Sequence, residues 1–544
     1  MMLTFQKSCI IGIASLFLMV LTLPVMAQGG GNSSPYDPTD FRPLGRFTIN
    51  ANELVYSPDG YHIIGLQEVL QEPAAEDETA EGTSDETDST DQEPVYVRML
   101  TMWDIRGGKT LWSVQLPDRD WERIEFSPDG TTIMVQTTLP YPNEEEVRLT
   151  FYDAATGEII SQTGNIDIIN APIIPGDLPQ GLYAESHYTA DGEHVVISYY
   201  RRTEAPQCGI WEVALANLLW EKDTLCGSVN ADGLYMLVPE PHANTYSAYR
   251  QLAAYDMLTG ELVSVSEDEV AEYSWLDTTH VLIHRPYGDP PIVWDILSNT
   301  RAVLELPSPM GMFWPDVLQG QLLYDNGSTM FVWEMRTGKL LREVNITGQP
   351  VIQPDRVLFL QTDDNWYELE PEDRNEAFVA TDFETAEVVW KARWQHDYLE
   401  VSPDGLIAAA FDGVLRTVDI FDLTTGKQLG SIPTLSDYYY LTPEWDWLVQ
   451  PSYDVFVVWG PPSQVGLFED VPSIKTVADT ELRYEPIAGY SSARTLPAGQ
   501  YLWAVGRTGN SAWIHVEDAR GSRYWVEADT IELLVPIEEI PSDE

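Results

Sequence analysis

The sequence predicts an all-β fold: a β-propeller of about eight four-stranded blades, within a range of seven to nine, followed by a small β-barrel. Three observations predict it. A turn of the form SPDG recurs along the chain, a second phrase follows in which an aromatic residue usually precedes an acid and a turn often written TG, and this rhythm stops near residue 471. A repeating unit of about 40–45 residues with four short strands is typical of a propeller blade.

The first phrase predicts a hairpin. Proline at the second turn position presets φ, and glycine at the last position accepts a positive φ, while β-rich runs flank each turn. The turn is intact three times and worn three times, at Ser57–Gly60, Ser127–Gly130, Ser402–Gly405, Thr189–Gly192, Asn230–Gly233 and Thr442–Trp445. We expect one such turn in each blade.

The second phrase reads, for example, "TMWDIRGGKTLWSV" or "DIFDLTTGKQLGS". Its aromatic positions are Trp103, Tyr152, Trp211, Tyr255, Trp294, Trp333, Phe383, Phe421 and, in the most degenerate form, Trp459. The acid that follows is Asp104, Asp153, Glu212, Asp256, Asp295, Glu334 or Asp422. A residue needed once in every blade indicates a hydrogen-bonding group at a turn rather than a catalyst.

Eight units are clear and a ninth, Ser436–Glu469, is frayed. The frayed unit lacks a convincing fourth strand, which the segment Leu44–Asn50 could supply. Such a strand would close the ring and leave no free sheet edge. We therefore place the propeller at residues 44–469.

These phrases resemble those of WD40-like and TolB-like β-propellers over Phe41–Glu469, and the "D..TG..LW" phrase also resembles the repeat of quinoprotein propellers. In such folds a binding site is usually built from the loops around the central channel that differ between blades. Here those connections carry Arg201, Arg202 and Arg285, unusual residues in so acidic a chain. They would bind an anionic ligand or pair with neighbouring carboxylates, and we favour the second interpretation.

The last 70 residues resemble a bacterial SH3-like (SH3b) domain over about Ile474–Leu534, which we bound at 472–535. "TELRYEP", "TLPAGQYLWAVGRTGNSAWIHVE" and "GSRYWVEADTIEL" follow one another in the order and spacing of that family's phrases. The resemblance implies a small barrel of five strands that binds cell-wall peptides or partner proteins. Strand alternation favours Trp513 and Trp525 in its core. The alternative is an exposed groove that carries Tyr484, Tyr490 and Tyr524.

Residues 1–27 are expected to be a secretory signal peptide. Lys7 precedes an apolar run, and Val25 and Ala27 are the small residues that signal peptidase recognises. The run approaches the length of a membrane span, so an uncleaved anchor is the alternative. Residues 28–43 are then a linker and 536–544 an acidic tail. The stretch 71–94 has ten acidic and no basic residues, which predicts a disordered insert.

Removal of the signal peptide would leave Cys208 and Cys226 as the cysteines of the chain. They flank one apparent hairpin that turns near Leu215, and export permits disulfides, so we expect them to pair. The formal net charge is −56. Such a surface repels phosphate backbones, which argues against nucleic-acid binding and favours basic partners.

No pattern of catalysis or resident cofactor is found. G-x-S-x-G, H-E-x-x-H and P-loop motifs do not occur, and Cys208 and Cys226 are not the adjacent pair that some quinone enzymes use. Oxygen-rich loops would allow weak calcium binding. His187, Asp191 and His194 lie close in sequence but match no established metal-ligand spacing, so we favour a polar blade edge.

The hypothesis we favour is a non-catalytic secreted or cell-envelope protein. Its propeller would be an interaction platform, and its terminal domain would attach it to peptidoglycan or to a protein partner. The alternative is an extracellular propeller enzyme, either a hydrolase or a quinone-dependent dehydrogenase. The sequence predicts no oligomeric state.

Overall fold

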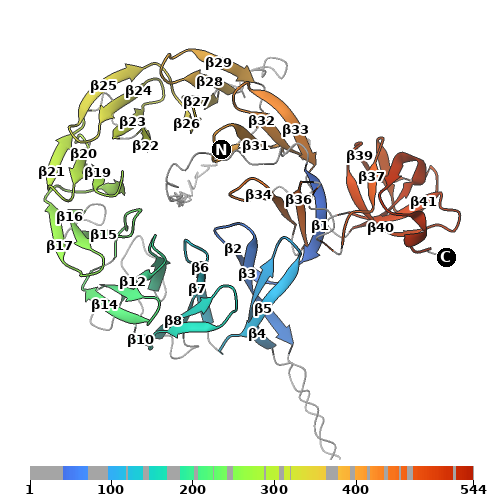
Figure 1. The fold of residues 1–544 in the computed structure, drawn as a ribbon, viewed down its shortest axis with the longest axis horizontal. Helices are drawn as coiled ribbons and strands as arrows, with labels where there is room; N and C mark the ends of the chain where they lie inside the picture. Colours follow the sequence, from blue (N-terminus) through green and yellow to red (C-terminus); the bar gives the residue numbers. More distant parts are fainter. Residues whose placement is uncertain are drawn as a thin grey trace, which may run out of the picture.

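The computed structural model describes residues 41–70, 96–117, 120–138, 146–167, 184–200, 206–224, 226–241, 249–286, 289–305, 312–318, 320–362, 378–392, 399–412, 417–433, 439–452, 455–461, 463, 468, 470–489, 491–518 and 522–542. Nine antiparallel sheets follow one another around a central opening, and a further sheet lies beside the ring (Figure 1). The chain is therefore a nine-bladed β-propeller with a C-terminal β-domain. The count lies within the predicted range but exceeds the central estimate of eight.

Blades are numbered here in chain order, and the strands of each blade run from the opening outward (Figure 1). Blade 1 contains β2 (Asn52–Tyr56), β3 (His62–Leu70), β4 (Tyr96–Asp104) and β5 (Lys109–Gln115). Blade 2 contains β6 (Asp120–Phe126), β7 (Thr132–Thr138), β8 (Glu146–Asp153), β9 (Ile159–Gln162) and β10 (Ile166–Asp167). Blade 3 contains β11 (Ala184–Tyr188), β12 (His194–Tyr200), β13 (Pro206–Glu212) and β14 (Asn217–Lys222).

Blade 4 contains β15 (Tyr235–Pro241), β16 (Tyr249–Asp256) and β17 (Leu262–Ser266). Blade 5 contains β18 (Glu272–Trp275), β19 (His280–His284), β20 (Ile292–Asp295) and β21 (Thr300–Val303). Blade 6 contains β22 (Met312–Leu318), β23 (Gln321–Asp325), β24 (Met330–Glu334) and β25 (Lys339–Val344). Blade 4 has three strands, and a single bridge between Val229 and Met236 stands at its innermost position.

Blade 7 contains β26 (Gln349–Ile352), β27 (Val357–Thr362), β28 (Phe378–Asp382) and β29 (Val388–Ala392). Blade 8 contains β30 (Leu399–Val401), β31 (Ile407–Asp412), β32 (Thr417–Asp422) and β33 (Lys427–Pro433). Blade 9 contains β34 (Tyr440–Leu441), β35 (Leu448–Ser452), β36 (Val455–Gly460) and β1 (Arg42–Thr48). The N-terminal strand β1 pairs with β36, from Arg42 opposite Gly460 to Thr48 opposite Val455. The segment proposed from sequence thus completes the frayed ninth unit as its outer strand.

Buried residues of blades 9 and 1 form one cluster, which closes the ring. Leu44, Trp447 and Val458 of blade 9 pack with Ile63 and Trp103 of blade 1. Each other pair of neighbouring blades is joined in the same manner by apolar side chains between the sheets, which is how a propeller distributes its core.

The blade register corrects one residue of the predicted repeat. The aromatic position of blade 8 is Phe421, which pairs with Gln428 just before a bulge. In blade 7 the residue with the matching place in the register is Thr381, opposite Val388. Phe383, which the sequence analysis assigned to that position, lies two residues later and is fully buried between the blades. The repeated acid of this blade is therefore Asp382.

The C-terminal domain is a seven-stranded sheet in the order β39-β38-β42-β41-β40-β37-β43. Its elements are β37 (Ile474–Thr476), β38 (Thr480–Arg483), β39 (Ser492–Leu496), β40 (Tyr501–Arg507), β41 (Trp513–Glu517), β42 (Arg523–Glu527), η5 (Ala528–Thr530), β43 (Ile531–Leu533) and η6 (Ile537–Glu539). It has seven short strands rather than the five expected. Within the described ranges, no helix is long and apolar enough to cross a membrane.

Candidate functional site

The Ser and Asp side chains of the SPDG turns are hydrogen-bonded to each other within their own turns. In the second of them Ser127 Oγ donates to Asp129 Oδ1 at 2.6 Å and accepts from the Thr132 amide at 2.9 Å. The Gly130 amide donates to Ser127 O at 2.8 Å, and Gly130 has a φ of +71°. The polar groups of the turn are therefore used to fix its shape, which leaves it no chemistry.

The repeated acid after the aromatic position is a turn residue too. Asp422 accepts hydrogen bonds from the amide and hydroxyl of Thr424 at 2.7 and 2.6 Å. Burial alone would raise the pKa of Asp422, but the hydrogen bonds from Thr424 and Thr425 outweigh it and lower the pKa. A carboxylate stabilised in its charged form by its own turn is poorly suited to proton transfer at neutral pH.

The tryptophan of the "D..TG..LW" phrase joins neighbouring blades. Trp390 of blade 7 donates from Nε1 to Leu423 O of blade 8 at 2.7 Å. Its ring packs on Gly426, where an added Cβ would lie 2.6 Å from the ring. Two further tryptophans make the same contact with the next blade, in the pairs Trp112–Ala154 and Trp220–Met257. The phrase that resembles quinoprotein repeats is thus explained here by packing.

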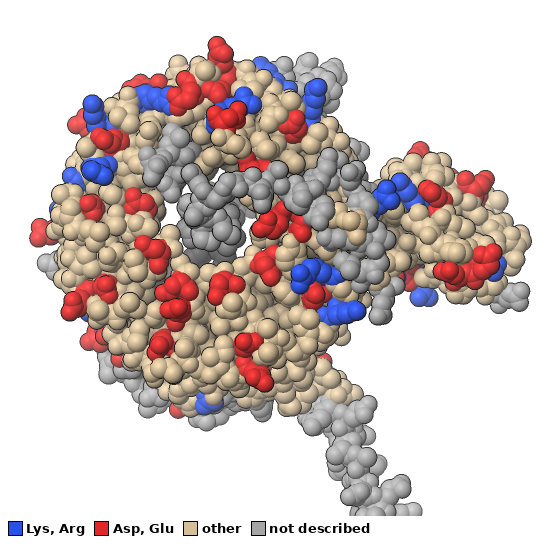
Figure 2. All heavy atoms as spheres, in the orientation of Figure 1, with Lys and Arg blue, Asp and Glu red and all other residues tan. Residues whose placement is uncertain are grey.

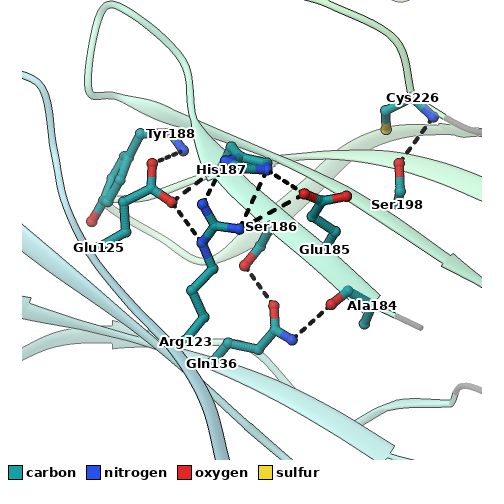
Figure 3. Close-up of polar contacts among 10 residues, drawn as sticks. All are labelled: Arg123, Glu125, Gln136, Ala184, Glu185, Ser186, His187, Tyr188, Ser198 and Cys226. Carbon is teal, nitrogen blue, oxygen red and sulfur yellow. Dashed lines mark hydrogen bonds and ion pairs between the residues drawn. The ribbon is translucent and has the colours of Figure 1, made fainter. Parts of the chain in front are cut away.

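Since the repeated residues are structural, candidate binding residues belong among those that do not repeat. One such group lies on β6 and β11, the innermost strands of blades 2 and 3 (Figure 3). Arg123 pairs with Glu125 at 3.1 Å and with Glu185 at 3.9 Å, and its Nη2 lies 2.9 Å from His187 Nδ1. His187 is also 3.0 Å from Glu185. We call these four residues the channel cluster.

The channel cluster combines burial with partial access. Burial raises the pKa of Glu125, although the charges of Arg123 and His187 favour its ionised form. The side chains of Glu185 and His187 are 41% and 45% exposed, so a ligand in the opening could reach them. Acidic side chains border the opening on the face shown in Figure 2, whereas most lysines and arginines lie farther out. The sequence places His187 close to Asp191 and His194, but its spacing does not indicate the partners on β6.

A second unusual group is Glu400 on β30, the innermost strand of blade 8. Burial raises the pKa of Glu400 from 4.5 to about 7. Glu400 is opposite Ala409 in the register, on the strand face that looks toward blade 9, where Tyr439 donates to Ala409 O at 3.4 Å. A carboxyl group that titrates near neutral pH is a candidate proton donor or acceptor.

Glu400 predicts a pH dependence of stability. Its folded pKa lies above its unfolded value, so the folded chain binds the extra proton between about pH 4.5 and 7. Stability should therefore fall as pH rises through this window, by up to about 3 kcal/mol at pH 8. Glu400→Gln should remove that loss, as measured by urea unfolding at pH 5 and pH 8. Glu272→Gln, an exposed position on the inner strand β18, is the control, and equal effects of both variants would contradict the assignment.

The surface residues predicted from sequence are only partly placed. Arg201, Arg202 and Tyr490 lie outside the described residues. Arg285 donates from Nε to Pro290 O at 2.6 Å and so braces its own loop. Tyr484 is 65% exposed, and its ring lies 5.8 Å from that of Tyr524, which packs partly against the core of the C-terminal domain. The structure thus brings Tyr484 and Tyr524 together, away from Arg285.

The expected core tryptophans of the C-terminal domain lie elsewhere. Its core contains Ile514, Val516 and Val526 but neither Trp513 nor Trp525. These two alternate to the outer face of β41 and β42, where the Trp525 ring stacks on His515 at 4.4 Å and Arg483 lies 5.9 Å above the Trp513 ring. The prediction that they fill the barrel was therefore wrong, because it assigned the buried face of each strand to the larger side chain.

Cys208 and Cys226 form a disulfide with a Cα–Cα distance of 4.8 Å. Cys226 follows the β13–β14 hairpin, and its amide donates to Ser198 Oγ at 3.0 Å (Figure 3). Both cysteines pack with Met236 and Val238, so the disulfide lies where blade 3 meets blade 4.

Groups of three or more metal-ligating side chains are not found among the residues that can be described. His187 belongs to the channel cluster, whereas His194 pairs with Asp191 at 2.9 Å. The pairing holds the pKa of His194 above its ordinary value. The three residues that sequence placed close together are thus divided between two sets of partners.

The sequence matches no model of a known protein family and no curated protein. Solved structures with a similar fold include the C-terminal WD40 domain of Sif2 (14% identity, 63% of this chain and 96% of that one, TM-score 0.35) and BamB from Moraxella catarrhalis (12%, 77% and 99%, 0.34). Another is the dihydro-heme d1 dehydrogenase NirN (13%, 71% and 76%, 0.36). These are propeller neighbours of the chain, and the likeness concerns the fold alone.

Proposed function

We propose that this protein is a non-catalytic interaction platform of the cell exterior or envelope. The observation that carries the proposal is the use of the repeated polar residues, which are engaged in turns and in contacts between blades. The groups left over are the channel cluster and the aromatic surface of the C-terminal domain. Both are accessible, and the net charge of −56 favours a basic protein partner for the propeller.

The C-terminal domain is proposed to be an SH3-like attachment module. Its strand-rich architecture and the three phrases quoted above support this assignment. Its candidate contact surface is formed by Tyr484 and Tyr524, because exposed tyrosines supply large contact areas at low entropic cost. The target would be peptidoglycan or a protein partner, and secretion through the N-terminal signal peptide would bring the protein to it.

The attachment proposal is tested with the full mature chain. The isolated domain is unsuitable because Trp503, which packs against blade 9, would become exposed. Wild-type protein should sediment with purified peptidoglycan or capture a partner, and Tyr484→Ala should weaken this by at least about tenfold. Tyr96→Ala removes a tyrosine of similar exposure from blade 1 and should have no effect. Absence of retention on both targets would contradict the proposal.

A second candidate function, an extracellular enzyme, is favoured by one observation, the raised pKa of Glu400. As a general acid or base Glu400 would act near neutral pH. Turnover of a hydrolase or dehydrogenase substrate that is lost in Glu400→Gln would support the enzyme. Turnover unaffected by this substitution would remove the role of Glu400.

A further inference from the structure

Four exposed leucines lie in the turns of three successive blades. The exposed fractions are 65% for Leu215 of blade 3, 50% for Leu234 and 57% for Leu258 of blade 4, and 58% for Leu297 of blade 5. Leu215, Leu258 and Leu297 belong to the turn before the outermost strand of their blade, and Leu234 follows the first turn of blade 4. We call these residues the leucine surface. Single exposed leucines are ordinary, so a role must follow from their arrangement.

Hydrogen bonds place these turns on one face of the ring. In blade 4 the buried Met257, which precedes Leu258, donates its amide to Leu234 O in the first turn at 2.9 Å, and Ile296 makes the equivalent bond in blade 5 at 3.0 Å. Both residues also accept from the preceding blade. Trp220 Nε1 donates to Met257 O at 2.7 Å, and Ser264 Oγ donates to Ile296 O at 2.6 Å. The leucines therefore follow buried anchor residues that are fixed at equivalent places in neighbouring blades.

The fold does not require leucine after the anchor residue. In blade 3 the equivalent anchor is the buried Val213, and Leu215 follows it by two residues. In blades 1, 2, 6, 7 and 8 the residue after the anchor is Arg106, Ala155, Arg336, Glu384 and Thr424, respectively. Since this position accepts side chains of such different size and polarity, packing within a blade does not explain leucine in three successive blades. Contact with another molecule explains it, because that contact would remove the apolar side chains from water.

The surroundings of the leucine surface are acidic. Glu193, Asp232 and Glu261 are exposed in the same turns, and Asp232 Oδ1 accepts from the Leu234 amide at 3.2 Å. The two turns of each of these blades contain no lysine or arginine, at residues 189–193, 212–217, 230–234, 256–262, 277–280 and 295–300. A second copy of this chain, with its net charge of −56, or an anionic membrane would meet like charge here. Charge complementarity therefore favours a basic partner.

From this arrangement we infer that the leucine surface docks a basic protein segment that presents apolar side chains on one side. The apolar side chains would pack on the leucines, and the lysines or arginines beside them would meet Glu193, Asp232 and Glu261. An apolar centre with a charged rim is the ordinary composition of a protein interface. The inference rests on the proposed function, a platform with a basic partner, and names the docking surface and the chemistry of that partner.

The test is fluorescence anisotropy of a labelled amphipathic peptide of leucine and lysine, titrated with the full mature chain at about 0.15 M salt. One control peptide has glutamate in place of each lysine, and the other has serine in place of each leucine. Wild type should bind the leucine–lysine peptide with a Kd below about 100 μM and at least about tenfold more tightly than either control. Absence of saturable binding up to about 300 μM would overturn this inference together with the basic partner of the proposed function.

Two variants connect the binding to this surface. Leu258→Thr combined with Leu297→Thr introduces the residue that blade 8 has at this position, Thr424, so thermal unfolding should be unchanged. The double variant should bind the leucine–lysine peptide at least about tenfold more weakly. Leu341→Thr removes a leucine of 47% exposure from the outer strand of blade 6 and should bind like wild type. Equal binding by wild type and the double variant would overturn the inference and leave the proposed platform intact, because the basic partner would then dock elsewhere.

Discussion

Replacing Arg46 with alanine is expected to lower the free energy of unfolding by about 3 kcal/mol and to release the C-terminal domain from the ring. Arg46 lies on β1, the strand that closes the propeller, and its side chain is only 12% exposed. It pairs with Asp470 at 2.6 Å and with Glu517 of the C-terminal domain at 2.8 Å. Removal of the guanidinium would leave both carboxylates without this partner.

The same side chain is held by an aromatic contact that salt screens little. Its guanidinium carbon lies 4.6 Å from the centre of the Trp503 ring, and Trp503 is 3% exposed. Trp503 packs with Trp459 and Phe41 of blade 9, and the Tyr501 ring meets Trp459 edge-on at 6.0 Å. The C-terminal domain therefore presses on the blade whose outer strand comes from the N-terminus.

Arg42→Ala provides the matched control for Arg46→Ala. Arg42 lies on the same strand but is exposed, so its removal should change the free energy of unfolding, measured in urea, by less than about 0.5 kcal/mol. Limited proteolysis should cut Arg46→Ala, but not Arg42→Ala, in the segment between blade 9 and β37. Equal stability and equal cleavage of the two variants would show that Arg46 does not join the domains.

The closure of the ring could be predicted because the ninth unit lacked one strand and a β-rich segment remained at the other end. The position of Trp503 could not. Strand alternation shows that a side chain faces inward or outward, but Trp503 is buried by another domain, which a local pattern does not contain. The error at Phe383 has a related cause. The repeats were aligned by their aromatic residues, whereas the structural equivalence is set by the shift in the β28–β29 register between Ala380 and Thr381.

The candidate sites show the same limit. The repeated Asp422 was correctly interpreted as structural because its repetition is visible in one dimension. The channel cluster joins Arg123 to His187, which are 64 residues apart. Nothing in the spacing of these residues marks them, since their proximity results from the packing of neighbouring sheets.

Replacing Gly405 with alanine is expected to destabilise the propeller by about 4 kcal/mol, whereas Gly192→Ala should cost only about 1 kcal/mol. The two glycines end equivalent turns and have nearly the same φ, +68° and +69°, so the conformational penalty of a side chain is matched. Their surroundings differ. A Cβ at Gly405 would lie 2.0 Å from the Ile352 carbonyl oxygen of blade 7, but a Cβ at Gly192 would meet nothing closer than 3.5 Å.

The comparison separates two roles of the same turn. If the SPDG glycine only permits a positive φ, both variants should lose the same stability in urea unfolding, with unchanged m-values. If the glycine at position 405 also lets two blades approach each other, Gly405→Ala should lose about 3 kcal/mol more unfolding free energy than Gly192→Ala. The Gln353 side chain of blade 7 donates to Gly405 O at 3.0 Å, which already ties the turn to its neighbour. We therefore expect the larger loss, because the backbone of blade 7 would have to move to admit the methyl group.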